Sequence, residues 1–374
     1  MMFIIHFRLL IRGDRMIERH QGIMPLSGIQ EAYYIGRNES FELGGKSAQV
    51  LYEFNLKLDA ERFEVAFNNV VKRHPMLRTI IMNEMQQKIL QEVPYYSILK
   101  EDISDKSTKE QCLMLQQCRQ EMFNTVFKTD KWPLFEIKLI KINEEEKHLL
   151  MSFDLLIADG NSLLVMIRDI LAYYYNKQAQ LPTFTRSYES YVNDKREYKL
   201  TSKRYIKDRA YWREKIKEIP LAPVLPEAYG MQGDNAVKRV MVTIKKELWG
   251  KVKDQATRHG VSPTVAVLCA YTHVLGHWSE QKNFTINMTL TEKVKYKMED
   301  VIGDFTTSIL IPVYEEDRAL EFWKAAKQLM YVFMEAYKHS SFEGVEVIKE
   351  IARSQQMEGL AVMPIVFTSM LFKE

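Results

Sequence analysis

The chain has 374 residues, 46% of them hydrophobic and 27% charged, which is typical of a globular protein with a large core. Its 52 Lys and Arg residues nearly balance 49 Asp and Glu residues, and a net charge of +3 over this length excludes a field that would hold nucleic acid or an anionic membrane. The three cysteines lack metal-ligand spacing and the eight histidines form no HExxH pair. We therefore expect reduced thiols in a cytoplasmic protein and no metal site.

Residues 1–22 are expected to be a leader or linker outside the fold. Their apolar run contains His6 and Arg8, is too short to span a bilayer, and is followed by charged residues without a small-residue cleavage site. No other segment approaches membrane length, so no membrane association is expected.

The next elements follow from hydrophobic periodicity. Residues 58–74 predict an amphipathic helix that Asp59 can cap and Pro75 ends. Segments 134–142 and 147–153, separated by an acidic turn, predict a β-hairpin.

The second strand of this hairpin leads into a polar turn, Asp154-Leu155-Leu156-Ile157-Ala158-Asp159-Gly160-Asn161-Ser162, which an apolar helix follows. Two carboxylates and a hydroxyl beside the free N–H groups of a helix start can support chemistry. The same residue types are also those that helix N-termini prefer as caps. Taken alone, the turn leaves both interpretations open.

The second half of the chain again interleaves helices and strands. Residues 185–219 are helical by pattern, and three prolines between 220 and 226 then enforce an extended connection. This connection is the best candidate for a boundary region, with a split closer to residue 190 as the alternative. Beyond it the pattern predicts strands and helices in alternation: strand 238–244, helices 245–259 and 264–278, strands 284–290 and 308–313, helix 320–339 and strand 362–368. The fold class is therefore α/β with two lobes.

Several short strings occur in a defined order around these elements. They are PLSxxQxAYxxGR at 25–37, RHPxLR at 73–78, DxxxxDxxS at 154–162, SPT at 262–264, GDFT at 303–306 and PIVFTS at 364–369. In this order and spacing the chain resembles the condensation superfamily of nonribosomal peptide synthetases, and more narrowly its heterocyclization (cyclization) branch. The resemblance covers roughly 25–371.

The resemblance implies two chloramphenicol-acetyltransferase-like α/β lobes in a V arrangement. The N-terminal lobe would comprise 23–195 and the C-terminal lobe 196–374. The turn at Asp154 would face the junction, with Thr368 and Asn287 contributed by the second lobe.

The turn differs from that of amide-forming relatives. Ordinary condensation domains carry HHxxxDG here, and the register places Asp154 at the first histidine and Leu155 at the second, the residue associated with amide formation. Because leucine cannot transfer a proton, an ordinary amide-forming domain is disfavoured.

The resemblance implies a two-stage enzymatic reaction. An acyl or peptidyl thioester would condense with the amine of a carrier-bound Cys, Ser or Thr, and the side-chain nucleophile would then close a thiazoline or oxazoline with loss of water. No cofactor would be bound. The substrates would arrive on 4'-phosphopantetheine of upstream and downstream peptidyl carrier protein domains, with an adenylation domain as a further partner.

Five residues are assigned catalytic roles from the resemblance: Thr368, Asn287, Asp154, Asp159 and Ser162. Thr368 is associated with cyclodehydration, although by pattern alone a β-branched residue at a strand end is the favoured explanation. Asn287 could donate to a carbonyl oxygen or satisfy backbone at a strand edge. Asp154 and Ser162 could take part directly, or bond the turn and cap the helix.

Asp159 is the motif residue with the strongest structural alternative. The resemblance implies a buried ion pair that holds the turn, with Arg73 or Arg78 as the partner. Asp304 and Ser369 are assigned to substrate binding, although the Gly-Asp pair of GDFT also suits a plain turn.

The sequence departs from the family pattern in two places. The family's TPQVxLD-type string, whose aspartate acts with the threonine of PVVFTS, does not follow Thr368 before the sequence ends at Glu374. Thr291-Glu292-Lys293 also replaces an aromatic-Asn-Arg run. We therefore expect an incomplete second lobe: a fragment of a larger synthetase, a product completed by another chain, or an inactive remnant that docks carrier domains. A domain that forms only the amide is a further alternative.

Overall fold

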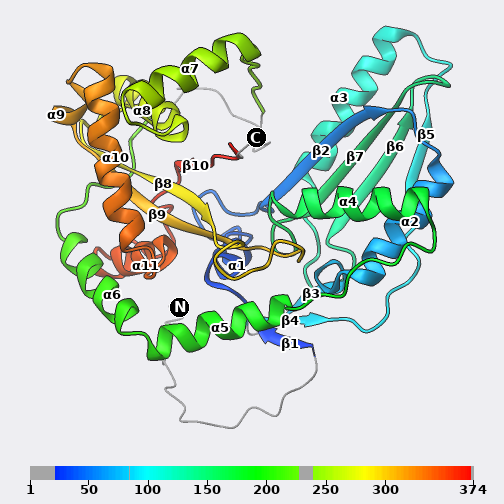
Figure 1. The fold of residues 1–374 in the computed structure, drawn as a ribbon, viewed down its shortest axis with the longest axis horizontal. Helices are drawn as coiled ribbons and strands as arrows, with labels where there is room; N and C mark the ends of the chain where they lie inside the picture. The colour runs from blue at the N-terminus through cyan, green and yellow to red at the C-terminus, as the bar shows by residue number, and fades with distance from the viewer. Residues whose placement is uncertain (1–21, 84, 227–238, 372–374) are drawn as a thin grey trace, which may run out of the picture.

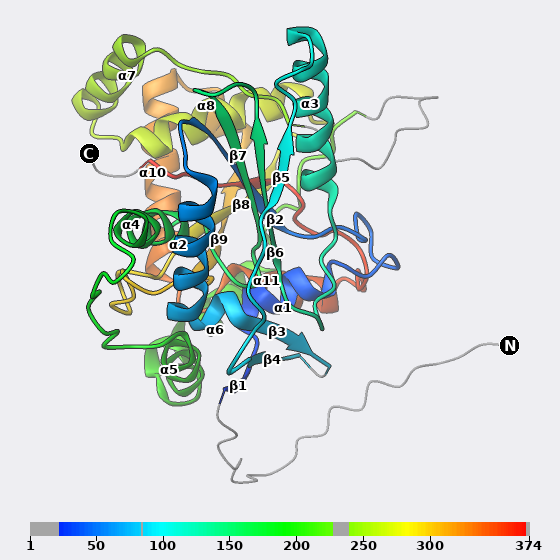
Figure 2. The same ribbon diagram turned by 90° about the vertical axis from the view of Figure 1, so that its right-hand side faces the viewer.

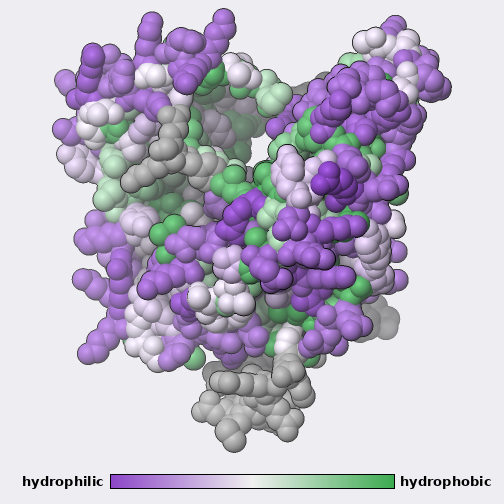
Figure 3. All heavy atoms as spheres, turned by 45° about the vertical axis from the view of Figure 1, so that its right-hand side comes forward, coloured by the Kyte–Doolittle hydropathy of each residue, from purple (hydrophilic) through white to green (hydrophobic). Residues whose placement is uncertain are grey.

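The computed structural model describes residues 22–83, 85–226 and 239–371, so the predicted leader lies outside the described residues except for Gly22. Two α/β lobes are set at an angle to each other (Figure 1), and the surface shows a notch between their upper ends (Figure 3). The predicted fold class, α/β with two lobes in a V, is confirmed. None of the helices within these ranges has the length and hydrophobicity needed to cross a bilayer.

The first lobe is built on a sheet in the order β2-β7-β6-β5, with β5 parallel to β6 and the other pairs antiparallel. Helices α2 and α4 lie side by side on one face of this sheet and α3 covers the other (Figure 2). The bounds are β2 Gln49–Leu56, α2 Ala60–Arg73, β5 Leu99–Asp102, α3 Thr108–Asn124, β6 Phe135–Lys141, β7 Lys147–Asp154 and α4 Ser162–Tyr175.

The predicted helix and hairpin of this lobe are confirmed as α2 and β6–β7. The Asp59 carboxylate caps α2 by accepting from the backbone N–H groups of Glu61 and Arg62, each at 3.0 Å. Phe67 and Val70 of α2 are fully buried, which explains the apolar face of this helix.

A small sheet in the order β1-β4-β3 lies below the first lobe, and helix α1 follows β1 into the middle of the molecule (Figure 1). The bounds are β1 Ile23–Pro25, α1 Gly28–Ile35, the 3-10 helix η1 Pro75–Arg78, β3 Thr79–Met82 and β4 Gln86–Ile89.

The second lobe contains a three-stranded sheet in the order β10-β8-β9, in which β10 is parallel and β9 antiparallel to β8. Helices α8 and α10 pack together, and both α10 and α11 contact β9. The bounds are α5 Tyr188–Thr201, α6 Lys203–Lys215, α7 Lys246–Arg258, α8 Pro263–Trp278, β8 Phe284–Thr291, β9 Thr306–Val313, α9 Glu315–Arg318, α10 Phe322–Lys338, α11 Gly344–Ser354 and β10 Val366–Phe367.

Two predicted strands of the second lobe are corrected. Residues 239–245 are irregular and exposed, with Val240 91% accessible, because no described strand pairs with them. The strand predicted over 362–368 is reduced to the two residues of β10.

The lobes are also joined by the segment between β8 and β9. Residues 298–305, which the sequence analysis placed in the second lobe, contribute four buried side chains to the core of the first. Phe305 among them lies against Tyr188 and Tyr191 of α5, with ring centroids 5.4 and 4.9 Å apart. The polar turn after β7 is therefore in contact with chain from both halves of the sequence.

Candidate active site

Asp154, the last residue of β7, is fully buried and forms an ion pair with the guanidinium of Arg37. Its other carboxylate oxygen accepts from the backbone N–H of Leu156 at 2.9 Å. Burial raises the pKa of Asp154, while the positive charge of Arg37 acts in the opposite direction. Because both oxygens are occupied by the turn and by Arg37, the geometry favours the turn-bonding alternative over proton transfer.

Helix α1 brings two residues of the PLSxxQxAYxxGR string to this turn. Arg37 follows the helix, and Gln30 lies within it, where its side-chain amide donates to the carbonyl of Leu156 at 2.6 Å and to Gln87 at 3.1 Å. Gln30 is fully buried. Gln30 and Arg37 of the PLSxxQxAYxxGR string therefore both hold the turn after β7 in place.

Asp159 and Ser162 are held together with the segment before β9. The Asp159 carboxylate accepts from the backbone N–H of Ser162 at 2.8 Å and lies 2.7 Å from its hydroxyl. The Ser162 hydroxyl is also 3.0 Å from the carbonyl of Gly303 and accepts from its N–H at 3.2 Å. Ser162 thus links the start of α4 to the GDFT string, and the helix cap itself is Asn161.

The ion pair predicted between Asp159 and Arg73 or Arg78 is wrong. Arg73 pairs with Asp169 of α4, its Nε 2.9 Å from the carboxylate, and Arg78 donates to the backbone carbonyls of Leu90 and Gln91. Arg73 ends α2 beside α4, whereas Arg78 ends η1 beside the carbonyls that follow β4. Asp159 is satisfied by backbone and hydroxyl donors instead.

Asp304 of the GDFT string is a second fully buried acid at this junction. One carboxylate oxygen accepts from the backbone N–H of Thr306 at 3.0 Å, and the other has no hydrogen-bond partner among the described residues. Burial raises the pKa of Asp304 to about 7, and the nearby Asp159 adds to the rise. This carboxyl group can therefore hold a proton near neutral pH.

Tyr33 of α1 lies among the acids of both lobes. Burial raises the pKa of its phenol, and the charges of Asp304, Asp159 and Asp154 raise it further. Tyr33 was not among the predicted site residues, although it lies inside the first string of the family pattern.

Thr368, Thr289 and Asn287 share one face of the second sheet. Val366 of β10 pairs with Asn287 of β8, which places Thr368 beside Thr289, and the two threonine hydroxyls are 3.0 Å apart. The side-chain oxygen of Asn287 is buried and has no described partner. The structure thus brings the predicted Thr368 and Asn287 onto adjacent strands, with an amide oxygen and an exposed hydroxyl left for other contacts.

The chain beyond β10 reaches the polar turn of the first lobe. A Cβ atom added at Gly160 would lie 2.8 Å from Cε and 3.0 Å from Sδ of Met370, so these residues are in contact. Ser369 is anchored differently, because its hydroxyl lies 3.2 Å from that of Thr264 at the start of α8. The segment bearing Thr368 therefore touches both lobes, while the catalytic and binding roles assigned to these residues stay predictions.

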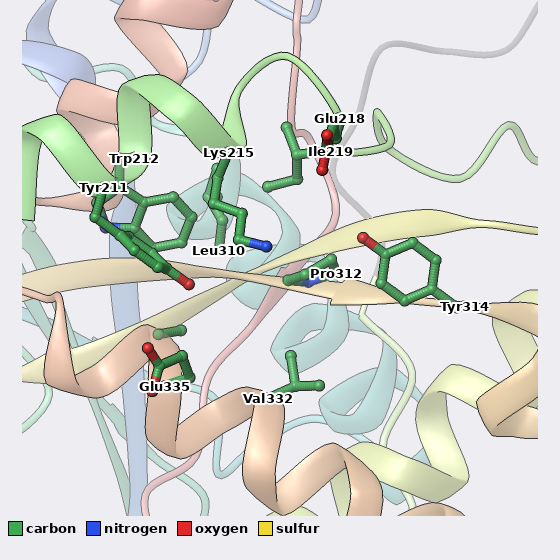
Figure 4. A pocket seen from close by; sticks show the side chains of 11 residues that line it. Tyr211, Trp212, Lys215, Glu218, Ile219, Leu310, Pro312, Tyr314, Val332 and Glu335 are labelled. Carbon is green, nitrogen blue, oxygen red and sulfur yellow. The ribbon is translucent and has the colours of Figure 1, made fainter.

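A separate cavity of about 200 Å³ lies in the second lobe between α6 and α10. Tyr211, Trp212, Leu310, Pro312 and Val332 line it (Figure 4), and none of the predicted site residues does. Within the described ranges, no three His, Cys, Asp or Glu side chains are arranged to hold a metal ion.

A family model describing the condensation domain matches residues 20–373, and the chain therefore belongs to the condensation-domain family. Condensation domains of nonribosomal peptide synthetases are acyltransferase-type enzymes, and the two-lobed fold described above is that of this class.

Individual relatives include bacitracin synthase 1 of Bacillus licheniformis, 34% identical over 96% of this chain and 7% of that protein. Phenyloxazoline synthase MbtB of Mycobacterium sp. is 26% identical over 93% of this chain and 29% of that protein. Among solved structures, the EpoB cyclization-docking bidomain of Sorangium cellulosum matches with a TM-score of 0.78 and 29% identity, covering 93% of this chain and 71% of that chain. The chain thus spans less than a third of these curated relatives.

Proposed function

We propose that the chain is a heterocyclization domain of a nonribosomal peptide synthetase. It condenses a carrier-bound acyl or peptidyl thioester with carrier-bound Cys, Ser or Thr and then closes the thiazoline or oxazoline ring. The substrates come on the 4'-phosphopantetheine arms of carrier domains, with an adenylation domain in the same assembly.

The single observation that carries the proposal is that the turn after β7 offers no proton-transferring histidine, whereas the second sheet presents Thr368 and Asn287. The turn that bears histidines in amide-forming domains has Leu155 at the second histidine position, and Asp154 is occupied by Arg37. The groups left for chemistry are the Thr368 hydroxyl and the side chain of Asn287, whose amide oxygen has no described partner, both on the second sheet. The likeness to the EpoB cyclization domain and to a phenyloxazoline synthase supports the same conclusion.

The reaction balances without a bound cofactor. In the first stage the amine attacks the thioester carbonyl, an amide bond forms and the carrier thiol leaves. In the second stage the side-chain thiol or hydroxyl attacks that amide carbonyl, and the carbonyl oxygen leaves as water. A hydroxyl and an amide near the carbonyl can stabilise the developing charge and relay protons.

Mass spectrometry of products from a reconstituted reaction with loaded carriers tests the proposal. We expect a carrier-bound product lighter than the amide by one water. An unchanged amide would assign the domain to simple condensation, and the absence of any product would assign it to an inactive carrier-docking module.

Thr368→Val provides the residue-level test, because valine keeps the β-branched shape and removes the hydroxyl. We expect the amide to accumulate and the ring-closed product to fall about a hundredfold, as for loss of a proton-transferring group. Thr289→Val is the matched control, since it removes the hydrogen-bond partner and leaves the Thr368 hydroxyl in place. Equal losses in both variants would contradict a specific role for Thr368.

A further inference from the structure

A positively charged groove runs beside α4 on the first lobe. Its deeper part, a cavity of about 380 Å³, is lined by Arg73, Arg168, Arg186 and Lys297. A shallower hollow of about 720 Å³ shares the Arg73 and Phe184 wall and adds Lys72 and Lys177. We call the two together the α4 groove, defined by these six cations.

The α4 groove has more positively charged side chains than carboxylates to pair with them. Arg73 and Arg168 share Asp169, Arg168 also pairs with Asp300, and Arg186 pairs with Asp194. The remaining cations, Lys72, Lys177 and Lys297, form no ion pair with any described residue. Six positive against three negative charges leave an excess of three, as large as the net charge of the whole chain.

The shape and lining of the groove narrow the choice of partner. Leu181, Pro182 and Phe184 lie between the cations, and Arg73 stacks on the Phe184 ring with its guanidinium carbon 4.2 Å from the centroid. Apolar side chains alternating with cations fit an amphipathic helix that carries Asp or Glu beside apolar residues. A continuous phosphate backbone fits less well, because Asp169 and Asp300 line the same groove.

One rim residue has an uncommon backbone. Lys297 has φ 56°, a left-handed conformation that non-glycine residues rarely adopt, and this conformation holds it at the wall of the deeper cavity.

The groove also lies near the candidate active site. Arg168 is six residues along α4 from Ser162, or about 9 Å at the helical rise. A partner bound in the groove would therefore sit within reach of the junction through a flexible arm.

We propose that the α4 groove docks the acidic helical face of a carrier domain. This inference rests on the proposed function for its partner, but the binding surface itself is argued from charge and lining.

Fluorescence anisotropy with a labelled amphipathic helical peptide, Glu on one side and Leu on the other, tests the docking surface without turnover. We expect saturable binding that weakens with added sodium chloride and is lost when every Glu of the peptide is replaced by Gln. The triple variant Lys72→Glu, Lys177→Glu, Lys297→Glu should bind about tenfold or more weakly. Its matched control is Lys109→Glu, Lys251→Glu, Lys324→Glu, which changes net charge equally at exposed lysines of α3, α7 and α10.

Equal losses in both triple variants, or no loss in the groove variant, would overturn the proposal. So would displacement of the peptide by inorganic phosphate but not by sodium chloride of the same ionic strength, or tighter binding of a single-stranded oligonucleotide. Failure of the proposed function is distinguishable, because it would leave peptide binding intact while loaded carriers give no ring-closed product.

Discussion

Two of the buried acids at the junction, Asp154 and Asp304, differ in how their carboxylate oxygens are hydrogen-bonded. Asp154 has a guanidinium and a backbone N–H, whereas one oxygen of Asp304 has no described partner. A buried carboxylate without a donor is costly when charged. Asp154 is therefore suited to holding the turn, and Asp304 to holding a proton.

Replacing Arg37 with Met should strongly destabilise the fold, because it leaves the Asp154 carboxylate buried and unpaired. We expect a loss of about 3–5 kcal/mol in the free energy of unfolding, measured by urea denaturation. The double variant Arg37→Met, Asp154→Leu removes both charges and should recover much of this loss. A double variant no more stable than the single one would show that the pair does not act as a unit.

Asp304 predicts a pH dependence of stability. Its pKa is about 7 in the folded chain against an ordinary value of 3.8, so the folded chain keeps a proton that the unfolded chain releases. The stability contributed by this group is present at low pH and is lost as pH rises through this window. The side chain of Asp304→Asn cannot ionise. The free energy of unfolding of this variant should therefore rise relative to that of the parent by up to about 1.4 kcal/mol per pH unit between pH about 4 and about 7. Urea denaturation at a series of pH values measures this difference, and a constant difference would contradict the raised pKa.

At the scale of elements, local sequence patterns predicted the helices and hairpins whose formation depends on residues close together in the chain. The helix ending at Pro75 and the hairpin before Asp154 follow from periodicity and turn residues. Residues 239–245 have the apolar composition of a strand, but a strand also needs a hydrogen-bonded neighbour, and no local pattern supplies one. The same limit explains why β10 is only two residues long.

The contact between Gly160 and Met370 predicts a specific steric effect. Gly160→Val would force the Met370 side chain away and shift the segment that carries Thr368. Under the proposed role of Thr368 we expect ring closure to fall about tenfold or more, since small misplacements at a reacting group are costly. The double variant Gly160→Val, Met370→Ala restores the space and should recover activity, as followed by mass spectrometry. A double variant as impaired as the single one would place the defect in the turn itself.

At the scale of the whole molecule, a buried network of charges fixes the lobes relative to each other. Lys195 of α5 contacts Glu343 at the start of α11 and lies 2.7 Å from Glu292, just after β8. Lys199 adds a second contact to Glu343 at 3.2 Å. Helix α5 leaves the first lobe and runs below both (Figure 1), so this network ties its path to the second sheet.

Lys195→Met should weaken this connection because Glu343 is buried and would lose its main partner. We expect a loss of about 3–5 kcal/mol in the free energy of unfolding, measured by urea denaturation. Lys199→Met is the matched control on the same helix, and it should cost less because Lys199 is more exposed and leaves Lys195 in place. Equal effects would show that neither lysine dominates the network.

The whole site could be predicted only in part. The strings identified the polar turn and Thr368, the resemblance added Asn287, and the structure brings Thr368 and Asn287 onto adjacent strands. The partner of Asp154 could not be predicted, because Arg37 is 117 residues away in the sequence and no local pattern links the two residues. The predicted partner of Asp159 was wrong for a related reason: sequence order does not reveal that Asp169 lies closer to Arg73.

The contacts of the segment that carries Thr368 limit how the two lobes can move relative to each other. Thr368, which directly follows β10, is hydrogen-bonded to Thr289 of β8 in one lobe, while Met370, two residues on, contacts Gly160 in the other. Any hinge movement that widens the V must break one of these contacts or stretch the chain between them. The position of the Thr368 hydroxyl is therefore coupled to the angle between the lobes, and a ligand that separates the lobes would shift the hydroxyl that we propose to act in ring closure.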